Sequence, residues 1–124
     1  MQPEVVIWEY PKLLSPAREA VYQRVEGMVG NTPLYEITRI PVPNGNRIFA
    51  KMENLNPTGS NFDRVYPYLF KLAEQKDLAV PGITPTIEVT TGNAGAAFAW
   101  TAQKLDFGSA EGGVIDWFDP NCAY

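Results

Sequence analysis

At 124 residues the chain is long enough for one modest domain, and 45% hydrophobic with 19% charged residues is typical of a globular protein rather than a disordered one. A net charge of −4 without a lysine or arginine cluster argues against nucleic-acid binding, and no apolar run approaches the roughly 20 residues that cross a bilayer. The chain has no histidine and one cysteine, Cys122, which excludes His-dependent triads, His-based zinc sites and an internal disulfide. The first residues do not resemble a signal peptide, so we expect a cytoplasmic protein without a metal site.

The first 28 residues are expected to form an extended arm followed by a short helix. Pro16 follows Ser15, a pair that is typical of an N-cap and the first helical position. The helix is predicted over residues 16–28 and should end near Gly30. Its partial apolar face consists of Ala20, Val21, Val25 and Met28.

Two strands and a second helix are predicted next. Residues 34–40 alternate in polarity and indicate a strand, and residues 47–53 indicate a second strand, antiparallel to the first across an Asn44-Gly45 turn. Ser60 is then placed to cap a helix over residues 60–75, in which Pro67 should cause a kink or a restart. The predicted apolar stripe of this helix comprises Phe62, Val65 or Tyr66, Leu69, and Leu72 or Ala73.

A third short strand is predicted at residues 87–89, followed by a tight loop and a helix over residues 96–105. This helix should pack through Ala97, Trp100 and Leu105. After Phe107 the apolar residues no longer follow a clear helix or strand periodicity. The tail is either a linker-like end or a segment that covers the exposed sheet or binds a partner through its apolar residues, which are Val114, Ile115, Trp117, Phe118 and Tyr124.

Two loops, residues 54–60 and 90–95, each lie between a predicted strand and a predicted helix. Both combine glycine with small polar residues, so their backbone N–H groups face a ligand at a helix N-terminus, where a carboxylate or phosphate is favoured. Taken singly, each loop is better interpreted as a plain capped turn than as a binding site. If the two strands are neighbours in an α/β sheet, the loops share the edge where ligands bind in such folds.

Three ordered motifs carry a family resemblance: V-G-N-T-P-L at 29–34, K-M-E-N-L-N-P-T-G-S at 51–60 and T-T-G-N-A-G at 90–95. They resemble the motifs of fold-type II pyridoxal-phosphate-dependent β-synthases such as cysteine synthase and cystathionine β-synthase. The resemblance implies an α/β fold, namely part of the small domain of such an enzyme with a few-stranded sheet flanked by helices. It divides the chain into an N-terminal arm and helix (1–28), a partial small domain (29–107) and a tail (108–124).

The resemblance also implies roles for individual residues. Phe62 stands at the position of the family's Schiff-base lysine, which leaves the chain without the family's catalytic amine. Asn93 matches the asparagine that contacts the cofactor, and the substrate carboxylate would be held by Thr90, Thr91, Gly92 and Asn93. Ala94 replaces a family threonine, and Lys51 is a weak alternative source of an amine. Pyridoxal phosphate is therefore the implied cofactor, but not as a covalent adduct here.

Two functions follow as expectations. In the first, the chain is a degenerate, non-catalytic cysteine synthase-like protein that binds a small amino acid or carboxylate, a second copy of itself or a full-length homologue. In the second, it is a fragment or mutant of an enzyme that replaces the β-substituent of serine or O-acetylserine with sulfide or a thiol. The family's glycine-rich phosphate cup is not matched by residues 111–114. A purely structural or oligomerisation module is a third, weaker interpretation.

Overall fold

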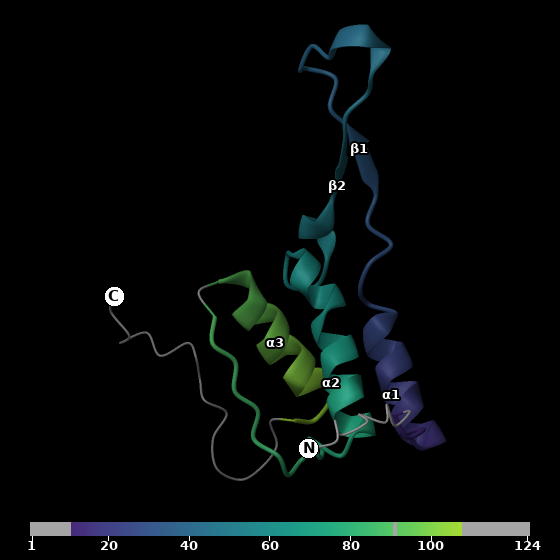
Figure 1. Cartoon of the computed structure of the whole chain (residues 1–124), viewed down its shortest axis with the longest axis vertical. Helices are drawn as coiled ribbons and strands as arrows, with labels where there is room; N and C mark the ends of the chain where they lie inside the picture. Colours follow the sequence, from purple (N-terminus) through teal and green to yellow (C-terminus); the bar gives the residue numbers. More distant parts are fainter. Residues whose placement is uncertain (1–10, 91, 108–124) are drawn as a thin grey trace, which may run out of the picture.

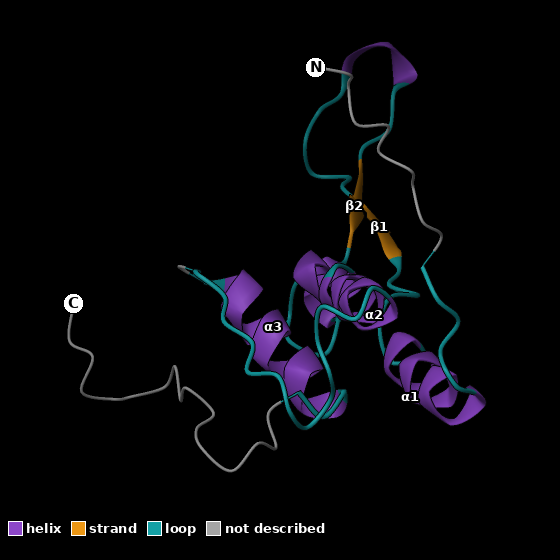
Figure 2. Cartoon of the chain, turned by 60° about the horizontal axis from the view of Figure 1, so that its bottom comes forward, coloured by secondary structure: helices purple, strands orange, loops and turns teal. Residues whose placement is uncertain are grey.

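The computed structural model describes residues 11–90 and 92–107, in which three helices pack together and a two-stranded hairpin projects away from them (Figures 1 and 2). The helices are α1 (Pro16–Glu26), α2 (Tyr66–Gln75) and α3 (Asn93–Lys104), and the strands are β1 (Leu34–Glu36) and β2 (Phe49–Lys51). Short 3₁₀ turns complete the chain as η1 (Pro43–Gly45), η2 (Glu53–Leu55) and η3 (Asn61–Arg64). This is a partial α/β domain, as the sequence predicts, while the expected arm before residue 11 and the tail after residue 107 lie outside the described residues.

Helix α1 begins as its sequence predicts. The Ser15 hydroxyl accepts a hydrogen bond from the Arg18 N–H at 3.3 Å, and Pro16 occupies the first turn. Tyr22 and Val25 are buried, whereas Met28, expected on the apolar face, lies beyond the helix end and is exposed. The burial of Tyr22 was not anticipated.

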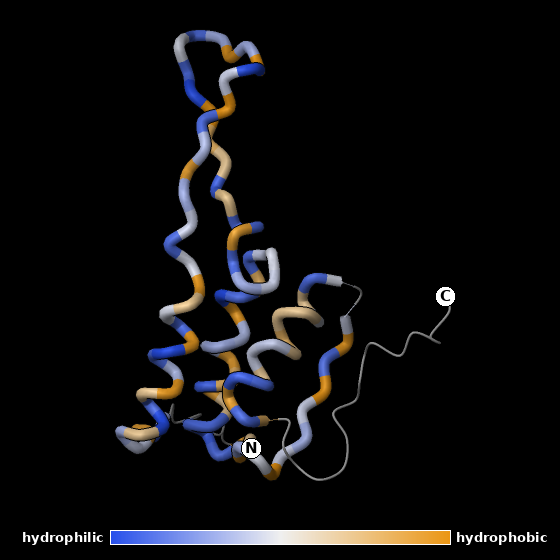
Figure 3. Tube along the Cα trace, turned by 180° about the vertical axis from the view of Figure 1, so that it is seen from behind, coloured by the Kyte–Doolittle hydropathy of each residue, from blue (hydrophilic) through white to orange (hydrophobic). Residues whose placement is uncertain are grey.

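The hairpin forms in the predicted antiparallel sense but with strands of three residues each. Leu34 pairs with Lys51 and Glu36 pairs with Phe49. At its tip Asn44 and Gly45 both adopt positive φ values, 62° and 70°, as the Asn-Gly signal indicates. The strands are shorter than predicted because no described element packs on their faces, and apolar stretches along the hairpin stand clear of the helices (Figure 3).

The segment 60–75 divides at Pro67, as predicted. Ser60 accepts a hydrogen bond from the Phe62 N–H at 3.3 Å to open η3, and α2 then restarts with Pro67 in its first turn. The predicted apolar stripe was right where it offered Tyr66 and Ala73, and wrong at Phe62 and Leu69. Tyr66 and Phe70 are buried, because their rings contact Phe98 of α3 at ring-centroid distances of 5.5 and 5.4 Å, and Ala73 packs against the same core. Phe62, Leu69 and Val65, the alternative to Tyr66, are exposed.

The predicted third strand does not form. Residues 87–89 run beside α3 without a strand assignment, and Val89 is 90% exposed (Figures 1 and 3). The loop that leads into this segment is held at Gly82, whose N–H donates to the Asp106 carbonyl at 2.5 Å. The expected ligand-binding edge between two neighbouring strands is therefore absent from the described residues, because a strand here has no partner to pair with.

The core lies where the three helices meet. Phe70 contacts Phe98 and Phe107, the latter at a ring-centroid distance of 4.8 Å, and Leu105 is fully buried among them. The burial of Ala97 and Leu105 is as predicted, and Trp100 packs against the edge of this core. These contacts fix the position of η3, which packs against α3.

Candidate functional site

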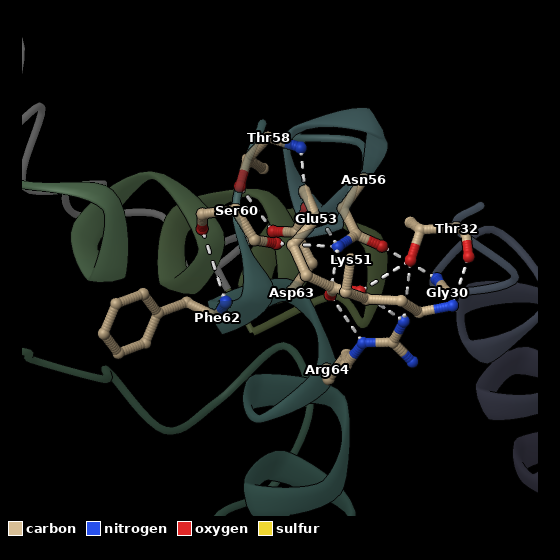
Figure 4. Close-up of polar contacts among 10 residues, drawn as sticks. All are labelled: Gly30, Thr32, Lys51, Glu53, Asn56, Thr58, Ser60, Phe62, Asp63 and Arg64. Carbon is tan, nitrogen blue, oxygen red and sulfur yellow. Dashed lines mark hydrogen bonds and ion pairs between the residues drawn. The ribbon is translucent and has the colours of Figure 1, made fainter. Parts of the chain in front are cut away.

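The two motifs at residues 29–34 and 51–60 meet at the base of the hairpin and form one polar cluster with η3 (Figure 4). We call it the motif cluster. Its members are Gly30, Thr32, Lys51, Glu53, Asn56, Thr58, Ser60, Asp63 and Arg64.

Asn56 joins three segments of the motif cluster. Its Oδ1 accepts a hydrogen bond from the Gly30 N–H at 2.8 Å, and its Nδ2 donates to the Glu53 and Ser60 carbonyls at 2.9 and 3.0 Å. Gly30 adopts φ 86°, and a Cβ there would lie 2.8 Å from Nη1 of Arg64. Glycine at this position therefore permits both the left-handed turn and the close approach of the guanidinium.

Glu53 is the charged centre of the motif cluster. Arg64 donates from Nε and Nη2 to its two carboxylate oxygens at 2.7 and 2.8 Å, and the Thr32 hydroxyl donates to Oε1 at 2.6 Å. The hydrogen bonds from Arg64, and then from Thr32, lower the pKa of Glu53 to about 2. This carboxylate is ionised and fully engaged, so it is a structural anchor rather than a general base.

Asp63 closes the loop that precedes η3. Its fully buried carboxylate accepts the Thr58 N–H at 2.7 Å and the Thr58 hydroxyl. The polar groups of the loop 54–60 are therefore used within the protein. The capped-turn interpretation of this loop agrees with the structure, and anion binding by the loop stays a prediction.

Phe62 lies beside the motif cluster but takes no part in it. Its ring points away from the polar side chains in Figure 4 and is 39% exposed. The expectation that Phe62 is a core residue was therefore wrong. Lys51, the alternative amine, donates from Nζ to the Thr32 carbonyl inside the cluster and is thereby committed to the framework.

The second loop is capped by Thr90. Its Oγ1 accepts hydrogen bonds from the Gly95 N–H at 3.0 Å and the Gly92 N–H at 3.3 Å, and a Cβ on Gly95 would collide with the Thr90 side chain. Gly92 and Asn93 are exposed at the start of α3, whose first turn contains no acidic residue. Thr91 lies outside the described residues.

The structure brings η3, which carries Phe62, against α3, which begins at Asn93. Two predicted site segments that are far apart in sequence are thus neighbours. The hydrogen-bond partners Glu53, Asp63 and Arg64 were not predicted from the sequence. The only sequence signal for them was their place within or directly after the second motif.

Within the described residues, no three His, Cys, Asp or Glu side chains are grouped as metal ligands. In the same part of the chain, every helix is too short or too polar to span a bilayer.

Comparison with known proteins gives the same family as the resemblance of the motifs. The pattern of the pyridoxal-phosphate dependent enzyme family matches residues 25–110. The chain belongs to this family. It is 40% identical to the cysteine synthase of Helicobacter pylori over 82 residues, which cover 64% of this chain and 27% of that protein.

Two further members give the same result. The chain is 44% identical to cysteine synthase 1 of Emericella nidulans, over 64% of this chain and 21% of that protein. It is 39% identical to the O-acetylserine dependent cystathionine beta-synthase of Bacillus subtilis, over 62% of this chain and 25% of that protein. The chain thus spans about a quarter of the length of these family members. The expected resemblance to fold-type II β-synthases is confirmed.

The family cofactor can be compared with the residues present. Covalent attachment of pyridoxal phosphate at the family position requires an amine, and Phe62 provides none. Lys51, the nearest amine in sequence, is exposed and donates from Nζ to the Thr32 carbonyl. The residue at the family position therefore does not fit a covalently held cofactor. The exposed start of α3 at Asn93 is the part of the implied site that stays accessible.

Proposed function

We propose that this chain is a non-catalytic, cysteine synthase-like protein that binds a small carboxylate, such as an amino acid, at the start of α3. The observation that carries the proposal is the aromatic side chain at position 62, directly beside the motif cluster. A phenyl ring neither forms an imine nor moves a proton, so the chain lacks the group on which the family's chemistry depends.

The binding half of the proposal rests on α3. The first turn of a helix has N–H groups without intrahelical partners and a partial positive charge. At α3 the Asn93 side chain and the neighbouring Gly92 are exposed, and no carboxylate in that turn opposes an anion. The Gly92 and Gly95 N–H groups already donate to Thr90 Oγ1, so the proposal places the carboxylate at the exposed Asn93 side chain.

Amide NMR titration of the full chain with L-serine and O-acetyl-L-serine tests the binding. We expect saturable shifts at residues 92–95 and none at the hairpin tip. Asn93→Ala should weaken binding at least several-fold, whereas Asn46→Ala at the hairpin tip should leave it unchanged. Shifts of equal size in both regions, or binding that is unaffected by Asn93→Ala, would contradict the proposal.

The second candidate function is that of a segment of a longer β-replacement enzyme, which the coverage of about a quarter of each relative favours. Incubation with pyridoxal phosphate, borohydride reduction and mapping of the modified lysines by mass spectrometry tests whether this chain by itself carries the family's chemistry. We expect no preferred lysine in the natural chain, no β-replacement turnover, and a preferred adduct at position 62 in Phe62→Lys. Turnover by the natural chain would instead establish the enzyme.

A further inference from the structure

One face of η3 and α2 is apolar but is not covered by any described residue, and we call it the bare face. Phe62, Val65 and Leu69 follow one another at spacings of three and four residues and are 39%, 43% and 46% exposed. The adjacent face of the same segment, with Tyr66 and Phe70, is buried against α3. The apolar arc of this segment is therefore wider than the part that the described residues cover. Apolar surface of this kind marks a contact with another segment.

The last described residue, Phe107, is buried against the same helix. Its ring centroid lies 4.8 Å from that of Phe70, on the covered face that is adjacent to the bare one. Val114 follows Phe107 by seven positions, and an extended chain over seven steps reaches roughly 23 Å. The rise from Phe62 to Leu69 is only about 11–14 Å. Residues that follow Val114 can therefore lie over the whole bare face.

The segment within this reach has the matching chemistry. Val114, Ile115, Trp117 and Phe118 place four large apolar side chains within five positions. They lie beyond residue 110, where the family match ends, so they are not part of the shared family pattern. Burial of two exposed apolar surfaces against each other is favourable by roughly 25 cal/mol per Å².

We propose that residues 114–118 dock on the bare face formed by Phe62, Val65 and Leu69 of the same chain. The chain's own segment is favoured over a second copy because a short tether gives an effective concentration in the millimolar range. A free second copy reaches that concentration only in very concentrated solution. The inference does not depend on carboxylate binding at α3.

The single cysteine makes a direct test simple. Cys122 follows Phe118 by four residues and is the only thiol, so one spin label attaches there without further substitution. In the full-length, isotope-labelled chain we expect strong paramagnetic broadening of the amide signals of residues 62–69. Amides near Arg24 on α1 and near Asn44 at the hairpin tip should be much less affected.

Two comparisons complete the experiment. A mixture of spin-labelled unenriched chain with unlabelled, isotope-enriched chain detects docking between copies. Broadening of residues 62–69 only in this mixture would overturn the proposal in favour of a dimer, and even broadening along the chain would overturn it altogether. Leu69→Glu should abolish the effect, whereas Gln23→Glu, an exposed substitution on α1, should preserve it. Amide spectra of both variants establish that they are folded.

Discussion

The Phe62 side chain is not held by its surroundings, unlike the polar side chains beside it. Asn56, Asp63 and Glu53 are each held by at least two hydrogen bonds, whereas the Phe62 ring points away from them into a partly exposed position. The framework that presents position 62 thus does not depend on which side chain stands there. The order of the motifs was readable from the sequence. The hydrogen bonds between the motifs could not be predicted, because they join residues up to 32 positions apart, such as Arg64 and Thr32.

The pH dependence of folding tests the role of Glu53. Its hydrogen bonds with Arg64 and Thr32 lower its pKa in the folded protein from the ordinary 4.5 to about 2. Its contribution to stability is therefore present above about pH 4.5 and is lost as the pH falls toward 2. We expect Glu53→Gln to lower the free energy of unfolding at pH 7, with a difference from the natural chain that shrinks between pH 4.5 and 2.

Urea denaturation at a series of pH values measures this difference. Glu26→Gln is the matched control, because the ion pair of Glu26 with Lys71 is 3.8 Å long and lies at the surface. The control should show a small difference from the natural chain at every pH. A difference for Glu53→Gln that stays constant down to pH 2 would mean that its ionisation does not support the fold.

At the scale of elements, the sequence predicted that α1, α2 and α3 exist but not which faces meet. Helix α2 is apolar on two adjacent faces, and periodicity left Val65 and Tyr66 as alternatives without deciding between these faces. The buried face is decided by aromatic contacts of Phe70 with α3 and by an ion pair with α1. In that pair Arg18 donates from Nε to the Glu74 carboxylate at 2.8 Å. Arg18 also donates from Nη2 to the Leu105 carbonyl at 2.6 Å.

Glu74→Ala should loosen the packing of α1 on α2. Glu74 also accepts a hydrogen bond from the Tyr22 hydroxyl at 2.9 Å, and burial together with this carboxylate raises the pKa of Tyr22. Removal of the carboxylate leaves two mostly buried donors without their partner, so we expect a loss of about 2 kcal/mol in the free energy of unfolding.

Chemical denaturation checks this value. Asp77→Ala serves as the control, because Asp77 pairs with Lys12 at the exposed surface and should contribute less than about 1 kcal/mol. Equal losses in the two variants would show that the contact between α1 and α2 does not depend on the Arg18–Glu74 pair.

At the scale of the whole molecule, the hairpin and the helices form regions of unequal stability. The helices share the core around Phe70, whereas β1 and β2 contact mainly each other and expose Leu34, Tyr35 and Phe49. Amide hydrogen exchange should therefore be slowest in α1, α2 and α3 and fastest near Asn44. Measurement by NMR or mass spectrometry decides this. Equal protection of hairpin and helices would mean that the chain opens as one unit.

The helices, the Asn-Gly hairpin, the restart at Pro67 and the family resemblance could all be predicted from the sequence, because caps, turn residues and motifs act over a few neighbouring positions. Three outcomes required the three-dimensional structure: residues 87–89 form no strand, the first loop is a capped turn, and Phe62 lies outside the core. These outcomes depend on partners supplied by distant segments, and a strand without a partner or an apolar face without a neighbour looks the same in sequence as one that has them.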